Sequence, residues 1–288
     1  MYAFVLNHFG NDLKYFKYEL YFLFSFRDKT KYDIIYLYSI NDTPKKFIKI
    51  INSLDLGIIT LPYDDLNITY NIPFNSYYTN FNLLRTCNYI FAYNLLQYKK
   101  VCIIESDMII TTNIDDIFLF KTPSIVYYPL ADLKNNQINK NIEVILNKSD
   151  KKKLLEYCPK ESFTNGGVIL FKPSIKIFNN LKKNISLIIN NQCIFPNETL
   201  FLYTIKKFYN LPIMYNFSHY FISIPKYKIE DKIKLLHFST SLYKPVYIIE
   251  DKSFDILKMK NPIKKKILLD YKKKYYNKYN KKIKKLIE

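Results

Sequence analysis

The stretch VCIIESDMII, residues 101–110, places two carboxylates directly after an unbroken apolar run. Residues 101–104 are mostly β-branched, which is typical of a strand buried on both faces. Glu105 and Asp107 follow where such a strand would end, and open α/β sheets bind their ligands at this carboxyl edge. Two acids at that edge indicate a site for a hard cation. The alternative is an ordinary strand-end turn with exposed acids.

The rest of the chain alternates between strand-like and helix-like patterns. Apolar runs at residues 2–6, 33–39 and 57–61 are separated by helical stretches at 13–27 and 45–54. This order is typical of right-handed crossovers in a parallel sheet. Further along, the pattern predicts helices at 81–99, 113–120, 175–190 and from Pro196 onward, strands at 124–128, 168–171 and 234–238, and a polar surface excursion at 132–162. We therefore predict an α/β fold with one domain over residues 1–257 and a helical tail over 258–288.

The composition is that of a globular protein with a strong bias toward a few residue types. The 288 residues are 49% hydrophobic, which excludes a disordered chain. Lys, Asn, Ile, Tyr and Phe dominate, Trp is absent, and the two arginines are Arg27 and Arg85. We attribute this usage to nucleotide bias in an AT-rich genome, so the 28 tyrosines carry little functional information.

Positive charge is concentrated at the C-terminal end. The chain has a net charge of +19, and residues 258–288 contain 13 lysines against Asp270 and Glu288, which leaves that segment at +11. Apolar residues recur there at about helical spacing, which predicts a basic amphipathic helix. Such a helix can contact an anionic membrane or a nucleic acid. The alternative is a solvated terminal helix.

The cysteines and the N-terminal segment bear on the compartment. The four cysteines, at positions 87, 102, 158 and 193, are widely spaced and include no C-x-x-C pair, so we expect free thiols instead of a zinc cluster or a disulfide framework. The first ten residues, MYAFVLNHFG, lack the basic and apolar regions of a signal peptide. No run of about 20 apolar residues is present to span a bilayer. We expect a soluble, cytoplasmic protein that is at most attached to a membrane surface.

Two further segments can carry chemistry. Gly166 and Gly167 are two of only four glycines, so they mark either a tight turn or a close approach of a ligand to the backbone. His237 ends the apolar run at 235–238, and its imidazole could complete a mixed oxygen and nitrogen site for Mn²⁺. Lys244, just downstream, could neutralise a phosphate. The alternative for His237 is a structural histidine.

In this order the segments resemble the motifs of the glycogenin-like members of glycosyltransferase family 8. That family has a D-x-D at a strand end, N-I-D-D-L-F after it, an N-G-G followed by a strand and Pro-Ser, a D-Q pair that opens a helix, and H-F-x-G with a later K-P. The corresponding residues here are Glu105-Ser106-Asp107, the segment NIDDIF at 113–118, Asn165-Gly166-Gly167 with Pro173-Ser174, Asn197-Glu198, and His237-Phe238 with Lys244-Pro245. The resemblance covers roughly residues 2–246.

The resemblance implies a GT-A fold, a Rossmann-like and mostly parallel mixed sheet flanked by helices. It also implies a UDP-sugar donor, a divalent cation (Mn²⁺ or Mg²⁺) and transfer of a hexose with retention at the anomeric carbon. Its metal ligands would be Glu105, Asp107 and His237. Its substrate-binding residues would be Leu6 and Asn7 toward the uracil, Asn165 and Gly166 on the sugar, and Lys244 on the diphosphate. Ser106 and Gly167 would also bind substrate, as would Arg85, the cationic residue on the helix before the acidic pair. Glu198 and Asn197 would be catalytic, with Glu198 either the carboxylate of a covalent route or a ligand of a sugar hydroxyl.

The chain departs from the family pattern at three places. Glu105 stands where the family has Asp, Asn197 replaces an acid, and residues 239–241 lack a glycine. We expect these departures either to alter donor choice or to mark weakened activity. Two alternatives therefore stay open, a sugar-nucleotide-binding protein with little turnover and a basic protein that binds nucleic acid or a membrane surface. The acceptor, a glycan or a protein, and association as a homodimer stay open as well.

Overall fold

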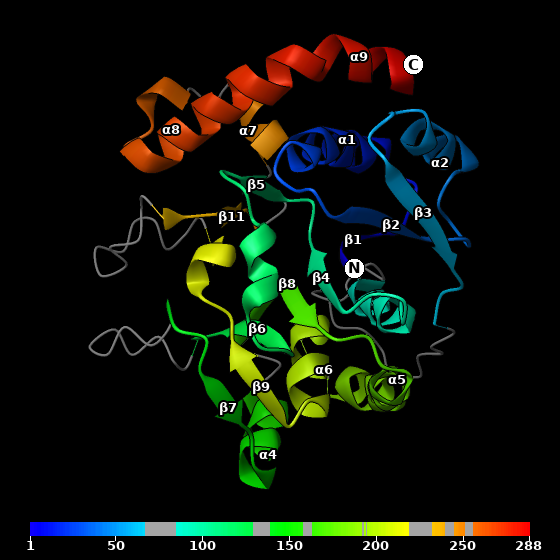
Figure 1. Ribbon diagram of the computed structural model, residues 1–288, viewed down its shortest axis with the longest axis vertical. Helices are drawn as coiled ribbons and strands as arrows, with labels where there is room; N and C mark the ends of the chain where they lie inside the picture. The colour runs from blue at the N-terminus through cyan, green and yellow to red at the C-terminus, as the bar shows by residue number, and fades with distance from the viewer. Residues whose placement is uncertain are drawn as a thin grey trace.

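The first 63 residues form the parallel half of a large sheet (Figure 1). Strands β1 (Tyr2–His8), β2 (Asp33–Ser39) and β3 (Ile58–Tyr63) lie side by side, β1 parallel to β2 and β2 parallel to β3. Helices α1 (Leu13–Arg27) and α2 (Lys45–Asn52) make the two crossovers. The alternation predicted from the sequence is thus confirmed here.

The other half of the sheet is largely antiparallel. Next to β1 lies β4 (Lys100–Ile104), which is parallel to it, and then β8 (Thr164–Phe171), which is antiparallel to β4. Beyond these follow β6 (Ser124–Tyr127), β9 (Lys207–Asn210) and β7 (Glu143–Ile145). The strand order is β3-β2-β1-β4-β8-β6-β9-β7.

A second, three-stranded sheet adjoins the first. It has the order β10-β11-β5, with β10 at Phe217–Ser218, β11 at Leu235–His237 and β5 at Met108–Ile110. Strand β5 follows β4 after only three residues, 105–107, so these residues connect the two sheets. The acidic pair therefore lies at the junction of both sheets.

This computed structural model describes residues 1–66, 85–128, 139–157, 163–191, 193, 195–218, 232–239, 245–250 (without the side chain of 247) and 256–288. Lys244 and residues 240–241 lie outside the described residues. The remaining described helices are the 3₁₀ helices η1 (Thr86–Asn94), η2 (Asp115–Leu119), η5 (Ile213–Tyr215) and η9 (Ile256–Lys258), the π-helical turn η10 (Lys272–Tyr276), and the α-helices α4 (Lys148–Tyr157), α5 (Ile175–Asn190), α6 (Pro196–Thr204), α7 (Pro245–Glu250), α8 (Pro262–Tyr271) and α9 (Asn277–Ile287).

The large sheet separates two hydrophobic cores. Successive residues of a strand point to opposite faces, and in β1 Phe4 and Leu6 join the core on the α1 side, while Ala3 and Val5 join the core on the α5 and α6 side. Burial on both faces explains why β1 and β4 are continuous apolar runs. The mixed, mostly parallel α/β architecture flanked by helices is the predicted one.

Several predicted elements differ from the observed ones. Residues 164–167 belong to strand β8 and form no turn, and the expected surface excursion at 132–162 contains β7 and α4. Both elements are short or rich in Lys, so their apolar pattern is weak. In the described part of the helix expected at 81–99, Arg85 is α-helical and Thr86–Asn94 form the 3₁₀ turns of η1.

The thiols differ in part from expectation. Cys87 and Cys102 are buried and free, as expected, whereas Cys193 is disulfide-bonded, which the expectation of free thiols did not include. Within the described residues, no helix combines the length and the apolar character needed to cross a bilayer.

The lysine-rich C-terminal segment packs along the outer side of α1 (Figure 1). Leu268, Tyr271, Tyr275 and Ile283 are buried in the same core as β1 and α1, and Tyr279 stacks on Phe24 with ring centroids 4.0 Å apart. Its outward side is a row of exposed lysines, here called the lysine ridge: Lys260, Lys266, Lys273, Lys274, Lys278, Lys281, Lys282, Lys284 and Lys285. The helix predicted over this segment is confirmed, and it shares the core of the sheet.

Truncation of Leu268 tests this packing. The side chain is fully buried, so Leu268→Ala should lower the free energy of unfolding by about 3 kcal/mol through lost burial and the cavity left behind. The matched control is Leu257→Ala, because Leu257 is 63% exposed and should change stability by less than about 0.5 kcal/mol. Urea denaturation of the full chain measures both values, and equal effects would mean that the C-terminal segment is not part of the core.

Candidate functional site

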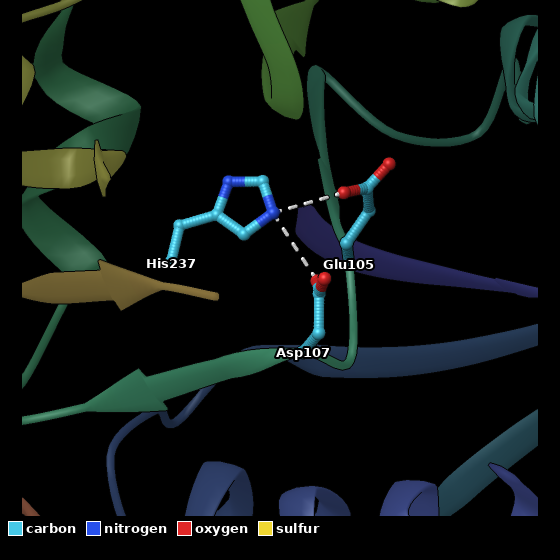
Figure 2. A group of neighbouring side chains, drawn as sticks. All are labelled: Glu105, Asp107 and His237. Carbon is cyan, nitrogen blue, oxygen red and sulfur yellow. Dashed lines mark ion pairs between the residues drawn. The ribbon is translucent and has the colours of Figure 1, made fainter. Parts of the chain in front are cut away.

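Three side chains far apart in the sequence meet at the junction of the two sheets (Figure 2). Nε2 of His237 lies 3.2 Å from a carboxylate oxygen of Glu105 and 3.2 Å from one of Asp107. The three ligand atoms lie within 4.8 Å of one another. Asp107 and His237 are buried, whereas Glu105 is 36% exposed, so the cluster is open on one side. The convergence expected from the family motifs is therefore observed.

Backbone pairing brings these residues together. Strand β11 runs antiparallel to β5, with His237 opposite Met108, and the N–H of Phe238 donates to the carbonyl of Asp107 over 2.9 Å. On the other side, the N–H of Glu105 donates to the carbonyl of Gly167 on β8 over 3.0 Å. The loop with both acids is thus held by one strand of each sheet.

The orientation of the imidazole is fixed by a residue that the sequence did not point to. Nδ1 of His237 faces away from the acids and lies 2.9 Å from Oδ1 of the buried Asn216. The amide of Asn216 is itself oriented, because its Nδ2 donates to the carbonyl of Asn165 over 2.9 Å. Its Oδ1 therefore accepts from Nδ1–H, so the lone pair of a neutral imidazole is on Nε2, toward the acids.

The two neighbouring glycines are required by close packing and not by backbone conformation, since neither has a positive φ. A Cβ on Gly167 would lie 2.5 Å from Cε1 of His237, and one on Gly166 would lie 2.6 Å from Nδ2 of Asn197. Of the two sequence interpretations, the tight turn is wrong. What approaches the backbone of this strand most closely is protein side chains.

Charge on the acids controls the protonation of His237. Burial disfavours the imidazolium, but Asp107 and Glu105 outweigh burial and raise the pKa of His237 to about 9. The two carboxylates thus attract positive charge strongly into one small volume. A dication would satisfy the same attraction, with the imidazole neutral and acting as a ligand.

The donor set fits a divalent cation. Two carboxylates and an imidazole suit metals such as Mn²⁺, and a neighbour that accepts from the other ring nitrogen is the usual support of a ligating histidine. Three protein ligands leave further coordination positions open, which phosphate oxygens or water can fill. Among the described residues, Glu105, Asp107 and His237 form the one group of three potential ligands close enough to share a metal ion.

A cavity of about 560 Å³ extends from the cluster. Asn7, Ser106, Asn165, Gly166, Asn197 and Glu198, all predicted as site residues, line it together with the three candidate ligands. Five aromatic residues also line it, and no pattern in the sequence pointed to them: Phe9, Tyr15, Tyr89, Tyr128 and Phe195. The volume and mixed polarity are those of a site for a small ligand.

Glu198 is an unusual acid in this wall. Burial, and then the charge of Glu105, raise the pKa of Glu198 to about 7. One of its oxygens accepts from the N–H of Gly166 over 3.2 Å, while Oε2 is buried with no hydrogen-bond partner among the described residues. A buried acceptor without a partner is costly, which favours a ligand group as its partner.

Three other predicted residues, Leu6, Gly167 and Arg85, do not line the cavity. Leu6 is buried in the core, and Gly167 packs against the ring of His237. Arg85 binds Asp42 and Asp65, which raise the pKa of the guanidinium although its burial opposes this. Leu6, Gly167 and Arg85 are absent from the cavity lining, and Lys244 is outside the described residues, so the binding roles of these four stay predictions.

Comparison with known proteins bears on the fold. No protein-family model matches the chain, and no curated protein matches it. Among solved structures, the bifunctional glycosyltransferase WbbM is similar with a TM-score of 0.57 and 15% identity, covering 99% of this chain and 51% of WbbM. The glycosyltransferase GlyE of Streptococcus pneumoniae TIGR4 has a TM-score of 0.55 and 15% identity, covering 97% of this chain and 63% of GlyE. The chain has a glycosyltransferase fold.

A third similar structure is an active-site mutant of LgtC, with a TM-score of 0.51 and 14% identity over 84% of this chain and 89% of LgtC. The GT-A fold class predicted from the motifs is confirmed. The chain spans about half of WbbM and less than two thirds of GlyE, and at these identities the likeness concerns the fold. In this glycosyltransferase fold, the candidate ligands lie at the carboxyl end of β4, the edge predicted from the sequence.

Removal of the Asn216 side chain tests the orientation of His237. Asn216→Ala should weaken Mn²⁺ binding by about 10- to 100-fold, because the imidazole loses the acceptor that fixes its tautomer. Asn216→Asp keeps an acceptor for Nδ1–H and should bind Mn²⁺ more tightly than the alanine variant. Asn184→Ala, which removes a hydrogen bond to Thr204 on the far side of the sheet, is the matched control. Calorimetry measures all three, and an alanine variant with unchanged affinity would rule out the positioning role.

The pKa of His237 predicts proton release on metal binding. Below about pH 9 the imidazole carries a proton that a cation must displace, so Mn²⁺ affinity should rise about tenfold per pH unit from about pH 6 to 8. Calorimetry in buffers of different ionisation enthalpy should count one proton released per Mn²⁺. His237→Gln should lose both the affinity and the proton release. An affinity independent of pH in the unaltered protein would contradict the assignment.

Proposed function

We propose that this protein is a metal-dependent, retaining glycosyltransferase of the glycogenin-like family 8 type, which transfers a hexose from a UDP-sugar to a glycan or protein acceptor. The observation that carries the proposal is the cluster of Glu105, Asp107 and His237 in the wall of a cavity of about 560 Å³ within a glycosyltransferase fold. The family motifs support the finer assignment of donor and stereochemistry.

The acidic end of the cavity would hold the diphosphate. Glu105, Asp107 and His237 would bind Mn²⁺, or Mg²⁺ as the second choice, and the bound cation would offset the negative charge that develops on the departing UDP. Without a cation, the two carboxylates would repel a diphosphate. Ser106, between the acids, donates its hydroxyl to Tyr15 over 3.2 Å and lines the same end of the cavity. Lys244 would add a positive charge there.

The sugar would lie against β8 and the start of α6. Asn165, Asn197 and Glu198 line this wall, and Oε2 of Glu198 is the buried acceptor that a sugar hydroxyl can satisfy. With a pKa of about 7, Glu198 is present in both protonation states near neutral pH. It can therefore accept from a hydroxyl as a carboxylate or donate to an oxygen as an acid. The closeness of Gly166 to Asn197 fixes both residues relative to the strand.

The uracil would lie at the end of β1. Asn7 lines the cavity, and its Oδ1 is buried without a hydrogen-bond partner among the described residues, so it can accept from the N–H of a pyrimidine. Phe9 also lines the cavity, and the guanidinium of Arg85 lies over its ring, 5.2 Å from the ring centre. Arg85 would then act on the base through Phe9. A cytoplasmic location, a homodimer and the division at residue 257 stay predictions from the sequence.

Loss of one acid tests the proposal. Asp107→Ala should reduce Mn²⁺-dependent hydrolysis or transfer from a panel of UDP-hexoses by at least about 100-fold, because the cation loses its buried carboxylate ligand. Asp270→Ala, an exposed acid on α8, is the matched control and should keep full turnover. Equal turnover of both variants would refute the metal assignment. UDP binding by calorimetry without turnover of any donor would instead identify a sugar-nucleotide-binding protein.

A further inference from the structure

The lysine ridge on the C-terminal helices presents charge alone to its surroundings. The apolar residues of the segment are already used, since Leu268, Tyr271 and Ile283 are buried against the body of the protein. The segment therefore has no free apolar face that could insert into a bilayer or that another protein could cover. A molecule that binds to this surface would therefore contact the lysine ammonium groups.

Few acids compensate the positive charge of the ridge within the described part of the chain, Asp28 near Lys278 among them. No ion pair found there involves a ridge lysine, and the acids on the segment are Asp270 and Glu288. The positive surface continues onto α2, where Lys45 and Lys49 are exposed. There Nζ of Lys46 donates to the carbonyl of Ile287 over 2.8 Å, which joins α2 to the end of α9.

We propose that the lysine ridge binds the anionic lipid headgroups of a bilayer and holds the protein against that surface by electrostatic attraction. Helices α8 and α9, which carry the ridge, lie along the outer edge of the molecule (Figure 1), where an extended surface can approach them. Lysine is a flexible point charge that suits a diffuse negative surface, and clusters of lysines are attracted to anionic leaflets.

The same segment lacks the groups with which proteins contact the bases of a nucleic acid. Binding of single strands uses aromatic rings on which bases stack. Here the rings face inward, since Tyr271 and Tyr275 are buried and Tyr276 and Tyr279 stack on Tyr21 and Phe24. The segment also contains no arginine, the residue that forms bidentate contacts to phosphate and guanine.

The ridge is connected to the candidate active site. Tyr271 lines a small hollow together with Ser106 and Asp107, so α8 lies directly behind the acidic loop. A bilayer bound at the ridge would therefore hold the cavity at a fixed position relative to the lipid surface.

Vesicle flotation of the full-length protein tests the proposal. We expect binding to phosphatidylcholine vesicles with about 30 mol% phosphatidylserine at about 0.1 M NaCl, and loss of binding at about 1 M NaCl, where charges are screened beyond about 3 Å. Pure phosphatidylcholine vesicles should not bind. Replacement of Lys273, Lys274, Lys281 and Lys285 by Gln should weaken binding at least about 100-fold, at about fivefold per lysine.

The matched control replaces four exposed lysines on α4 and α5, at the other end of the molecule, Lys153, Lys176, Lys182 and Lys183, also by Gln. It changes the net charge equally and should weaken vesicle binding by less than about threefold if the ridge is the contact surface. Circular dichroism should show both variants folded. Equal weakening by both variants, absence of binding by the unaltered protein, or tighter binding to RNA or duplex DNA than to the vesicles would each overturn the proposal.

Discussion

The site depends on the pairing of β11 with β5. This antiparallel contact involves three residues of each strand, yet it sets His237 opposite Met108 and next to Asp107. Without it, the acids at the end of β4 would face the cavity alone. Short strands add little stability by themselves, so the register is reinforced from both sides. The carbonyl of Gly167 holds Glu105, and the carbonyl of Asp107 accepts from Phe238. The geometry of the cluster is thus set by the backbone hydrogen bonds at the junction of the two sheets.

The cluster concentrates charge in a buried place, which proteins do at a cost in stability. The carboxylates of Asp107 and Glu105 raise the pKa of His237, and Glu105 also helps burial to raise the pKa of Glu198. An arrangement with such mutual perturbation is typical of functional sites. Gly167 and Asn216 hold the imidazole from two directions, one by contact and the other by a hydrogen bond. Both interactions act on the same ring, so its Nε2 has little freedom to turn away from the acids.

Much of the fold could be predicted because the apolar runs of the parallel strands and the helices between them are long. The acids at 105 and 107 followed from their place after such a run. Strand β5 could not be predicted, since three apolar residues after a loop have no period of their own. Residues 164–167 suggested a turn because glycine is rare in strands. Gly167 is needed there because its backbone packs against His237, which is 70 residues away in the sequence. Asn216 gave no signal, because asparagines are abundant throughout the chain.

The small hollow shared by Tyr271, Ser106 and Asp107 has a practical consequence. A truncated variant designed for better solubility would naturally omit the lysine-rich C-terminal segment, because the composition of this segment suggests that the fold does not need it. In this molecule such trimming would remove Tyr271 from the hollow beside the acidic loop and would open the core beside α1 to water. Loss of activity in such a truncated variant would not be evidence for lipid attachment, because the truncation would also disturb the core and the surroundings of the candidate site.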